Sequence, residues 1–185
     1  MRHRAAQRAR PDLGTSCFIA LGANLGDPVA TVTAAINALR ELPLTRFVAA
    51  SSLYRTAPVG LRHQPDFINA VVELVAVSPK GTSFGAPSAP TLLEELFGIE
   101  ARFGRLRSVK NAPRTLDLDL LLYGAEVSDD PQLTLPHPRL HERAFVLAPL
   151  AEIAPQLLIP GRGRVADLLL QCADQRIERM LPQAA

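Results

Sequence analysis

The sequence predicts an α+β fold in which helices pack on a largely antiparallel sheet. Three observations support this class. The chain has 185 residues, which is enough for one domain with a sizeable core. Its first seven expected elements follow the order strand, helix, strand, strand, helix, strand, helix. We find no internal repeat and no linker that would divide the chain into two domains.

The hydrophobic pattern of the first half predicts one helix and three strands. Asp27 and Pro28 form a typical helix start, with an acid at the cap and a proline at the first helical position. The connection 55–66 is longer than two strands need, which is common in functional loops. The expected elements are a strand over 16–21, a helix that begins at 28 and ends before Pro43, and strands over 47–54 and 67–77.

The second half is expected to contain three helices and a strand that carries two acids. Thr91 is expected to cap the first of these helices, since Glu94 follows it at the spacing of a capping box. Pro149 should interrupt the second. The expected elements are a helix over 91–104, a strand that ends before the turn 123–124, and helices over 140–153 and 165–172. Together they predict a ferredoxin-like sandwich.

Charge and composition limit the function. We expect residues 1–15 to be a disordered basic tail, residues 16–185 to be one domain, and the Pro/Gly-rich stretch 78–90 to be a flexible insertion. Beyond residue 10, sixteen basic residues stand against eighteen acidic ones, which argues against general nucleic-acid binding. No apolar run approaches a membrane span and no secretory signal is evident, so we expect a cytoplasmic protein.

The motif with the clearest chemistry is the leucine-rich strand with Asp117 and Asp119. Strand side chains alternate, so the two carboxylates share one face, and Leu116, Leu118 and Leu120 point to the other. Two adjacent like charges need a counter-charge. The preceding segment supplies five cations and no acid: Arg102, Arg105, Arg107, Lys110 and Arg114.

Two interpretations of this acid–base cluster are open. The segment can be a solvated loop in which one or two arginines pair with the aspartates. Alternatively, carboxylates with Cα atoms roughly 6.6 Å apart can converge on two divalent ions, with the cations neutralising a polyphosphate. The second interpretation predicts phosphoryl or pyrophosphoryl transfer from a nucleotide. The chain lacks a GxxxxGK[ST] loop, so the cations and metal would hold the nucleotide.

Six sequence blocks, in order, resemble the 6-hydroxymethyl-7,8-dihydropterin pyrophosphokinases, which transfer pyrophosphate from ATP to a pterin hydroxymethyl group in folate biosynthesis. The resemblance extends from about Phe18 to about Leu158. The blocks are GANLGD (22–27), YRTAPVG (54–60), QPDFINAV (64–71), GRLR (104–107), APRTLDLDLLLYG (112–124) and PHPRLHERAFVLAPLAEIAP (136–155).

The resemblance implies a role for fifteen positions. Asp117 and Asp119 would bind two Mg²⁺ ions and would be catalytic together with Arg105 and Arg107, which would lie on a loop that closes over the triphosphate. A flat heteroaromatic ring requires aromatic faces and an amide partner. The residues implied in nucleotide binding are Glu100, Lys110, Arg114, His137 and Arg143, and those implied in pterin binding are Thr56, Pro58, Val59, Phe67, Asn69 and Phe145.

Several of these residues have a simpler interpretation. Phe67 and Phe145 can be core residues, His137 a surface histidine, Glu100 a helix-end charge, and Arg143 a partner of Glu142 or Asp66. Compared with many relatives, this chain lacks the tryptophan before Pro113, and its loop between Arg107 and Arg114 is one residue shorter. Phe97 stands where relatives have an amide that contacts the nucleotide, and Ala23 replaces a small hydroxyl.

Two other functions remain as alternatives. A two-metal nuclease could use the same aspartates, although such an enzyme would be expected to carry a net positive charge beyond the basic tail. A regulatory binding module could use them only structurally. The expected partners are small molecules, with neither nucleic acid nor membrane, and the expected state is a monomer.

Overall fold

The computed structural model describes residues 14–58, 64–78, 85–105 and 114–181. Its main sheet has the strand order β10-β3-β4-β1-β5, and β2 also pairs with β4. All of these pairings are antiparallel, which confirms the predicted sheet type. The six strands are β1 (Thr15–Ala23), β2 (Thr45–Ala50), β3 (Tyr54–Thr56), β4 (Phe67–Ala76), β5 (Asp117–Tyr123) and β10 (Ile177–Arg179).

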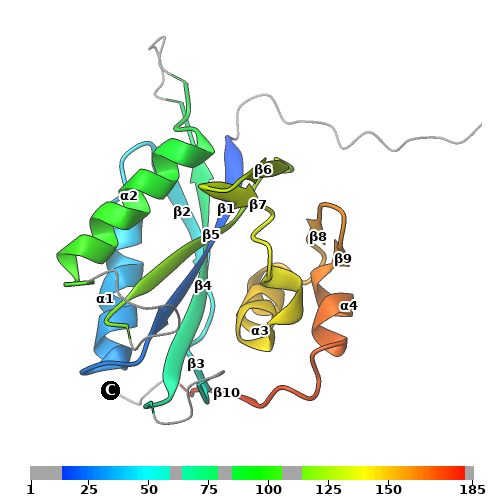
Figure 1. Ribbon diagram of the computed structural model, residues 1–185. Helices are drawn as coiled ribbons and strands as arrows, with labels where there is room; N and C mark the ends of the chain where they lie inside the picture. The colour runs from blue at the N-terminus through cyan, green and yellow to red at the C-terminus, as the bar shows by residue number, and fades with distance from the viewer. Residues whose placement is uncertain (1–13, 59–63, 79–84, 106–113, 182–185) are drawn as a thin grey trace, which may run out of the picture.

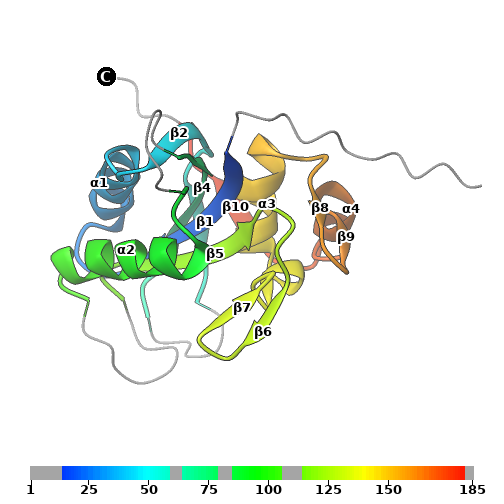
Figure 2. The ribbon, with the colours of Figure 1, turned by 90° about the horizontal axis from the view of Figure 1, so that it is seen from above.

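Helices cover both faces of this sheet (Figures 1 and 2). The helices α1 (Pro28–Arg40) and α2 (Ala89–Arg102) pack on one face, and α3 (Ala144–Ile153) packs on the other, with α4 (Val165–Leu170) packed against α3. The alternation of β1 explains the two cores: Ile19 and Leu21 point to α1 and α2, whereas Phe18 points to α3 and α4. Two short hairpins complete the described fold, β6 (Ser128–Asp130) with β7 (Leu133–Leu135) and β8 (Leu158–Ile159) with β9 (Gly163–Arg164).

The start of α1 confirms the predicted cap. Asp27 is the N-cap, and its carboxylate accepts a hydrogen bond from the Ala30 backbone N–H at 3.0 Å. The predicted cap of α2 is wrong. Ser88, not Thr91, is the N-cap, and its hydroxyl accepts from the Thr91 N–H at 3.4 Å. The helix begins earlier because Pro90 is compatible with a first helical turn.

Three further elements show the largest differences from the sequence expectation. The strand expected over 47–54 is divided into β2 and β3, which pair with different halves of β4. The helix expected over 140–153 is divided into a 3₁₀ turn (Leu140–Glu142) and α3, because Arg143 has an extended backbone. The last helix ends at Leu170 rather than at residue 172. The hairpins and β10 were not predicted from the sequence.

The leucine face of β5 is confirmed. Leu116, Leu118 and Leu120 are all buried in the core beneath α1 and α2. Cys17 and Cys172 are buried free thiols. None of the described helices is long and apolar enough to cross a membrane. Most of the predicted tail (1–13) and the middle of the predicted insertion (79–84) lie outside the described residues, so both remain predictions.

Candidate functional site

One row of strand residues places the predicted metal and pterin residues on the same face. Gly22 of β1 lies directly opposite Asn69 of β4 on one side and Asp117 of β5 on the other. Directly opposed residues in an antiparallel sheet direct their side chains to the same face. Further along β1, Ala20 lies opposite Asp119. The side chains of Asn69, Asp117 and Asp119 therefore all project from the face on which α3 packs.

Gly22 keeps the space between these polar side chains free. It has no side chain of its own, and a Cβ atom placed there would lie 3.3 Å from Oδ1 of Asn69. Neighbouring strands are about 4.8 Å apart, so Asn69 and Asp117 stand roughly 10 Å apart across this glycine. This face of the sheet thus carries the amide of Asn69 on one side of Gly22 and the carboxylate of Asp117 on the other.

The two aspartates differ in their surroundings. The Asp117 side chain is 17% exposed, with Oδ1 2.6 Å from Nη1 of Arg105 and Oδ2 paired with Arg114. The Asp119 side chain is 39% exposed, and its Oδ2 lies 4.0 Å from Nε2 of His137. The interpretation in which arginines pair with the carboxylates therefore holds for Asp117 in this state. Asp119 retains solvent-facing oxygen atoms.

Glu100 joins the end of α2 to the aspartate strand. It is only 2% exposed, so it is not a charge at an exposed helix end. Its Oε1 accepts a hydrogen bond from the Leu118 N–H at 2.7 Å and pairs with Arg105. The Arg105 N–H also donates to the Glu100 carbonyl at 3.2 Å. Glu100 thus fixes the backbone between the two aspartates and holds Arg105 beside Asp117, and its nucleotide contact remains a prediction.

His137 is fixed at the free edge of β5. Its N–H donates to the Leu121 carbonyl at 2.9 Å, and its Nδ1 accepts from the Arg139 N–H at 3.3 Å. Burial lowers the pKa of His137, Asp119 opposes this shift, and the cations Arg143 and Arg139 add to it. The imidazole is therefore neutral near pH 7, with Nε2 facing Asp119.

Two arginines show that positive charge accumulates here. Burial lowers the pKa of Arg114, and nearby Arg105 lowers it further. Burial likewise lowers the pKa of Arg143, and Arg139 adds to the effect. Guanidinium groups gathered at this density favour an anion with several oxygen atoms, because each group can donate two parallel hydrogen bonds.

The predicted pterin residues line the same face beyond Gly22. The Asn69 side chain is buried and donates to Oγ1 of Thr56 at 2.8 Å. This hydrogen bond uses one of its two amide hydrogens.

Phe67 and Phe145 are half-buried and are absent from the fully buried core. Arg143 lies over the Phe145 ring, with Cζ 5.4 Å from its centre. Pro58 is half-buried and stands two residues after the end of β3. Val59, Arg107 and Lys110 lie outside the described residues.

The donor set fits a hard divalent cation that also binds a substrate. Among the described residues, no group of three or more His, Cys, Asp or Glu side chains could hold a metal ion. Asp117 and Asp119 supply only carboxylate oxygens, and Mg²⁺ is commonly held by one or two carboxylates plus substrate phosphates. A metal ion at Asp117 would compete with Arg105 and Arg114 for the carboxylate oxygens.

Sequence reasoning missed three residues of this site. Gly22 and Asn24 belong to the quoted block GANLGD, but neither of them was assigned a role from the sequence. Arg139 follows His137 and contributes to the positive charge around it. The signal that could have found Gly22 is its position at the end of an apolar strand, where a missing side chain often marks a close approach.

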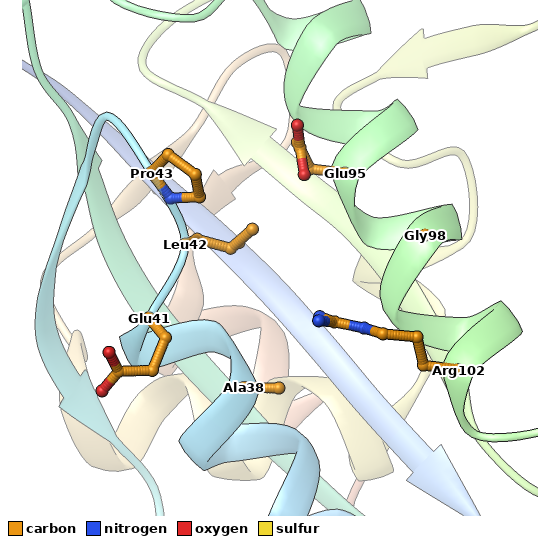
Figure 3. Close-up of a pocket in the computed structure, with 7 residues that line it drawn as sticks. All are labelled: Ala38, Glu41, Leu42, Pro43, Glu95, Gly98 and Arg102. Carbon is orange, nitrogen blue, oxygen red and sulfur yellow. The ribbon is translucent and has the colours of Figure 1, made fainter.

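A separate hollow lies between α1 and α2 (Figure 3). Residues at the end of α1 and on one side of α2 line it, and Arg102 extends from α2 across it. It lies on the opposite face of the sheet from Asp117 and Asp119, and none of the fifteen predicted site residues lines it. We therefore place the candidate site on the α3 face.

Comparison with known proteins points to one family. Residues 18–155 match the model of the 7,8-dihydro-6-hydroxymethylpterin-pyrophosphokinase family. The chain is 42% identical over 164 residues to a 2-amino-4-hydroxy-6-hydroxymethyldihydropteridine pyrophosphokinase of Pseudomonas aeruginosa, covering 88% of this chain and 95% of that one. It is 40% identical over 168 residues to the protein of the same name from Haemophilus influenzae, covering 90% and 99%.

Solved structures show the same fold. A Plasmodium falciparum HPPK-DHPS triple mutant with pteroate superposes with a TM-score of 0.64 at 12% identity, covering 90% of this chain and 44% of that chain. The wild-type protein with pteroate gives a TM-score of 0.61 at 12% identity, covering 90% and 44%. This chain therefore spans less than half of those longer proteins, and at this identity the likeness concerns the fold alone.

Proposed function

Because the chain belongs to the 7,8-dihydro-6-hydroxymethylpterin-pyrophosphokinase family, and is thus an ATP-dependent pyrophosphokinase of folate biosynthesis, we propose that Asp117 and Asp119 direct its reaction. In this reaction the hydroxymethyl oxygen of the pterin attacks the β-phosphorus of ATP in line. The bond from the β-phosphorus to the oxygen shared with the α-phosphate breaks, and AMP leaves. The proposed site has a nucleotide side and a pterin side.

The observation that carries the proposal is the row Asn69, Gly22, Asp117 across three strands. It puts an amide suited to a heteroaromatic edge and a metal-binding carboxylate on one face, with an empty position between them. A ring held by Asn69 then directs a short substituent toward Asp117. Positioning of this kind supplies much of the rate enhancement in a transfer between two bound substrates.

On the nucleotide side, Asp117 and Asp119 would hold two Mg²⁺ ions, which would supply positive charge for the phosphates and would make the acceptor hydroxyl more acidic. Arg105 and Arg114 now neutralise Asp117. We assign both to the phosphate oxygens once the nucleotide binds, where their forked donors stabilise the charge that develops. Arg107 and Lys110 have the same role in the proposal, from the same segment.

His137 and Arg143 complete the nucleotide side. His137 is held by its backbone and by Nδ1, so that Nε2 faces Asp119. A neutral imidazole can accept or donate one hydrogen bond without adding charge. Arg143 lies over Phe145 at the start of α3 and brings a cation to the boundary between the two substrates.

On the pterin side, Phe67 and Phe145 would provide the two aromatic faces, and Asn69 the polar contact. Thr56 already orients the Asn69 amide, which leaves one N–H and the carbonyl oxygen for a ligand. Pro58 and Val59 would close the side of the pocket. The half-buried state of both phenylalanines supports this role, since a core residue would be fully buried.

AMP release from ATP, with and without the hydroxymethyl pterin, tests the proposal. We expect pterin-dependent release in the wild-type protein and none above background in Asp117→Ala or Asp119→Ala. Asp129→Ala, an exposed aspartate in the β6–β7 hairpin, is the matched control and should retain full activity. Wild-type rates in either site variant would refute the assignment.

Calorimetry separates the alternatives. A non-hydrolysable ATP analogue should bind wild-type protein only with Mg²⁺, and removal of either carboxylate should abolish that dependence. A structural role for the aspartates predicts no such dependence, and a nuclease would show Mg²⁺-dependent cleavage of nucleic acid instead. The acidic balance beyond residue 10 disfavours the nuclease.

A monomeric state and a cytoplasmic location belong to the proposal as well. In the described structure both sets of site residues come from one chain, so a monomer would suffice for catalysis. Analytical ultracentrifugation of the purified protein at micromolar concentration tests this, and a stable dimer would contradict it.

A further inference from the structure

We propose that Asn24 is a positioning residue for both substrates. From the end of β1 it holds in place the segment that leads to the pterin side and the segment that leads to the nucleotide side. This inference rests on the proposed function, because it assigns the two sides to the two substrates. Asn24 directly follows β1, the strand whose Gly22 separates Asn69 from Asp117. It is not among the residues implied by the family resemblance.

The contacts of Asn24 reach both substrate segments. It is 2% exposed. Its Nδ2 donates to Oε1 of Gln64 and to the carbonyl of Pro65, both at 3.2 Å. Its Oδ1 accepts from the Arg114 N–H at 2.9 Å, and its own N–H donates to the Arg114 carbonyl at 3.1 Å. Every donor of this residue, and the side-chain acceptor, is therefore used.

The two tethered segments lead directly into the substrate residues. Gln64 and Pro65 come just before Phe67, the first residue of β4 and a predicted pterin wall. Arg114 comes just before Asp117, the first residue of β5 and a predicted metal ligand. The backbone of Arg114 is held by Asn24 while its guanidinium group pairs with Asp117. A shift of Asn24 would displace both strand entrances together.

The chemistry requires an amide at this position. Arg114 needs an acceptor for its N–H, whereas Pro65 offers only a carbonyl oxygen and needs a donor. Asparagine supplies both from one short side chain, aspartate supplies acceptors alone, and alanine supplies neither. Because the side chain is buried, each contact that is lost leaves a polar group without its partner.

Kinetics of Asn24→Ala and Asn24→Asp test the proposal against a purely structural role. Asn24→Ala should raise the KM for both substrates about tenfold and lower kcat, since contacts to both sides are lost. Asn24→Asp keeps the acceptor for Arg114 but opposes the Pro65 carbonyl with a carboxylate. It should therefore raise the KM for the pterin about tenfold while the KM for ATP changes less than about twofold. A structural role would move only the thermal midpoint.

Two further variants make the result decisive. Asp27→Ala removes the N-cap of α1 in the same turn, so it should lower the thermal midpoint and leave both KM values unchanged. Gln64→Ala removes one pterin-side contact without touching β1, and should raise the pterin KM alone even if the Asn24 variants do not fold. Unchanged KM values in Asn24→Ala, or in Gln64→Ala, would overturn the proposal.

The wild-type protein separates this inference from the proposed function. If it releases AMP only with the hydroxymethyl pterin and Asn24→Ala matches it, only the role of Asn24 is refuted. If the wild-type protein shows no pterin-dependent AMP release, the proposed function fails and this inference fails with it.

Discussion

Replacing Gly22 with alanine tests the geometry on which the proposed site depends. Gly22 lies between Asn69 and Asp117 on the substrate face, and it does not have a positive φ that only glycine would tolerate. The backbone therefore accepts alanine. The new methyl group would occupy the empty position across which the pterin substituent is proposed to reach Asp117.

The structure sets the size of the effect. The added Cβ would lie 3.3 Å from Oδ1 of Asn69, closer than the ~3.5–4.0 Å of a relaxed contact. The Asn69 amide must shift, which weakens its hydrogen bond to Thr56 by about 1 kcal/mol. Alanine in a strand gains about 0.5–1 kcal/mol over glycine. These terms nearly cancel, so we expect little change in stability but a pterin KM raised about tenfold, equivalent to about 1.4 kcal/mol.

Steady-state AMP release and thermal unfolding together measure this prediction. Gly98→Ala is the matched control, because a Cβ added to this helical glycine meets nothing within 4 Å. It should stabilise α2 by about 1 kcal/mol and leave both KM values unchanged. A Gly22→Ala enzyme with the wild-type pterin KM would refute the argument that this face holds the pterin.

Three further substitutions test other parts of the structure. Glu100→Gln keeps an acceptor for Leu118 but removes the charge beside Arg105, so AMP-release assays should show a roughly tenfold lower kcat. Glu152→Gln weakens the hydrogen bonds that this carboxylate accepts from Ser52 and Tyr54. It should lower the free energy of unfolding in urea by about 2 kcal/mol at neutral pH. Burial raises the pKa of Glu152, but the hydrogen bonds from Ser52 and Tyr54 outweigh burial and hold the pKa below its ordinary 4.5. The loss in the free energy of unfolding should therefore shrink as the pH falls below that value. An equal loss at about pH 4 would contradict this. Phe145→Leu should raise the pterin KM severalfold without changing the calorimetric affinity for an ATP analogue. A lower affinity for the ATP analogue would contradict the placement of this ring on the pterin side.

Local sequence patterns were enough for the features that depend on neighbours along the chain. Strand alternation alone placed Asp117 and Asp119 on one face and the leucines that alternate with them on the other, as the structure confirms. The cap at Asp27 could also be predicted, because a cap involves residues within one turn. The cap of α2 was missed because two hydroxyl residues, Ser88 and Thr91, both suit that role.

Only the tertiary structure decided which distant residues meet. Asn24 contacts residues 40 and 90 positions away, and Glu100 reaches Leu118 from another element. The register of β1 with two other strands places Gly22 between Asn69 and Asp117. Such register is fixed by the pairing of whole strands and by the cores on either side of the sheet, and a one-residue slip would reverse every face. The sequence by itself determined the chemistry of the aspartate strand, whereas the packing of the sheet determined what stands across from it.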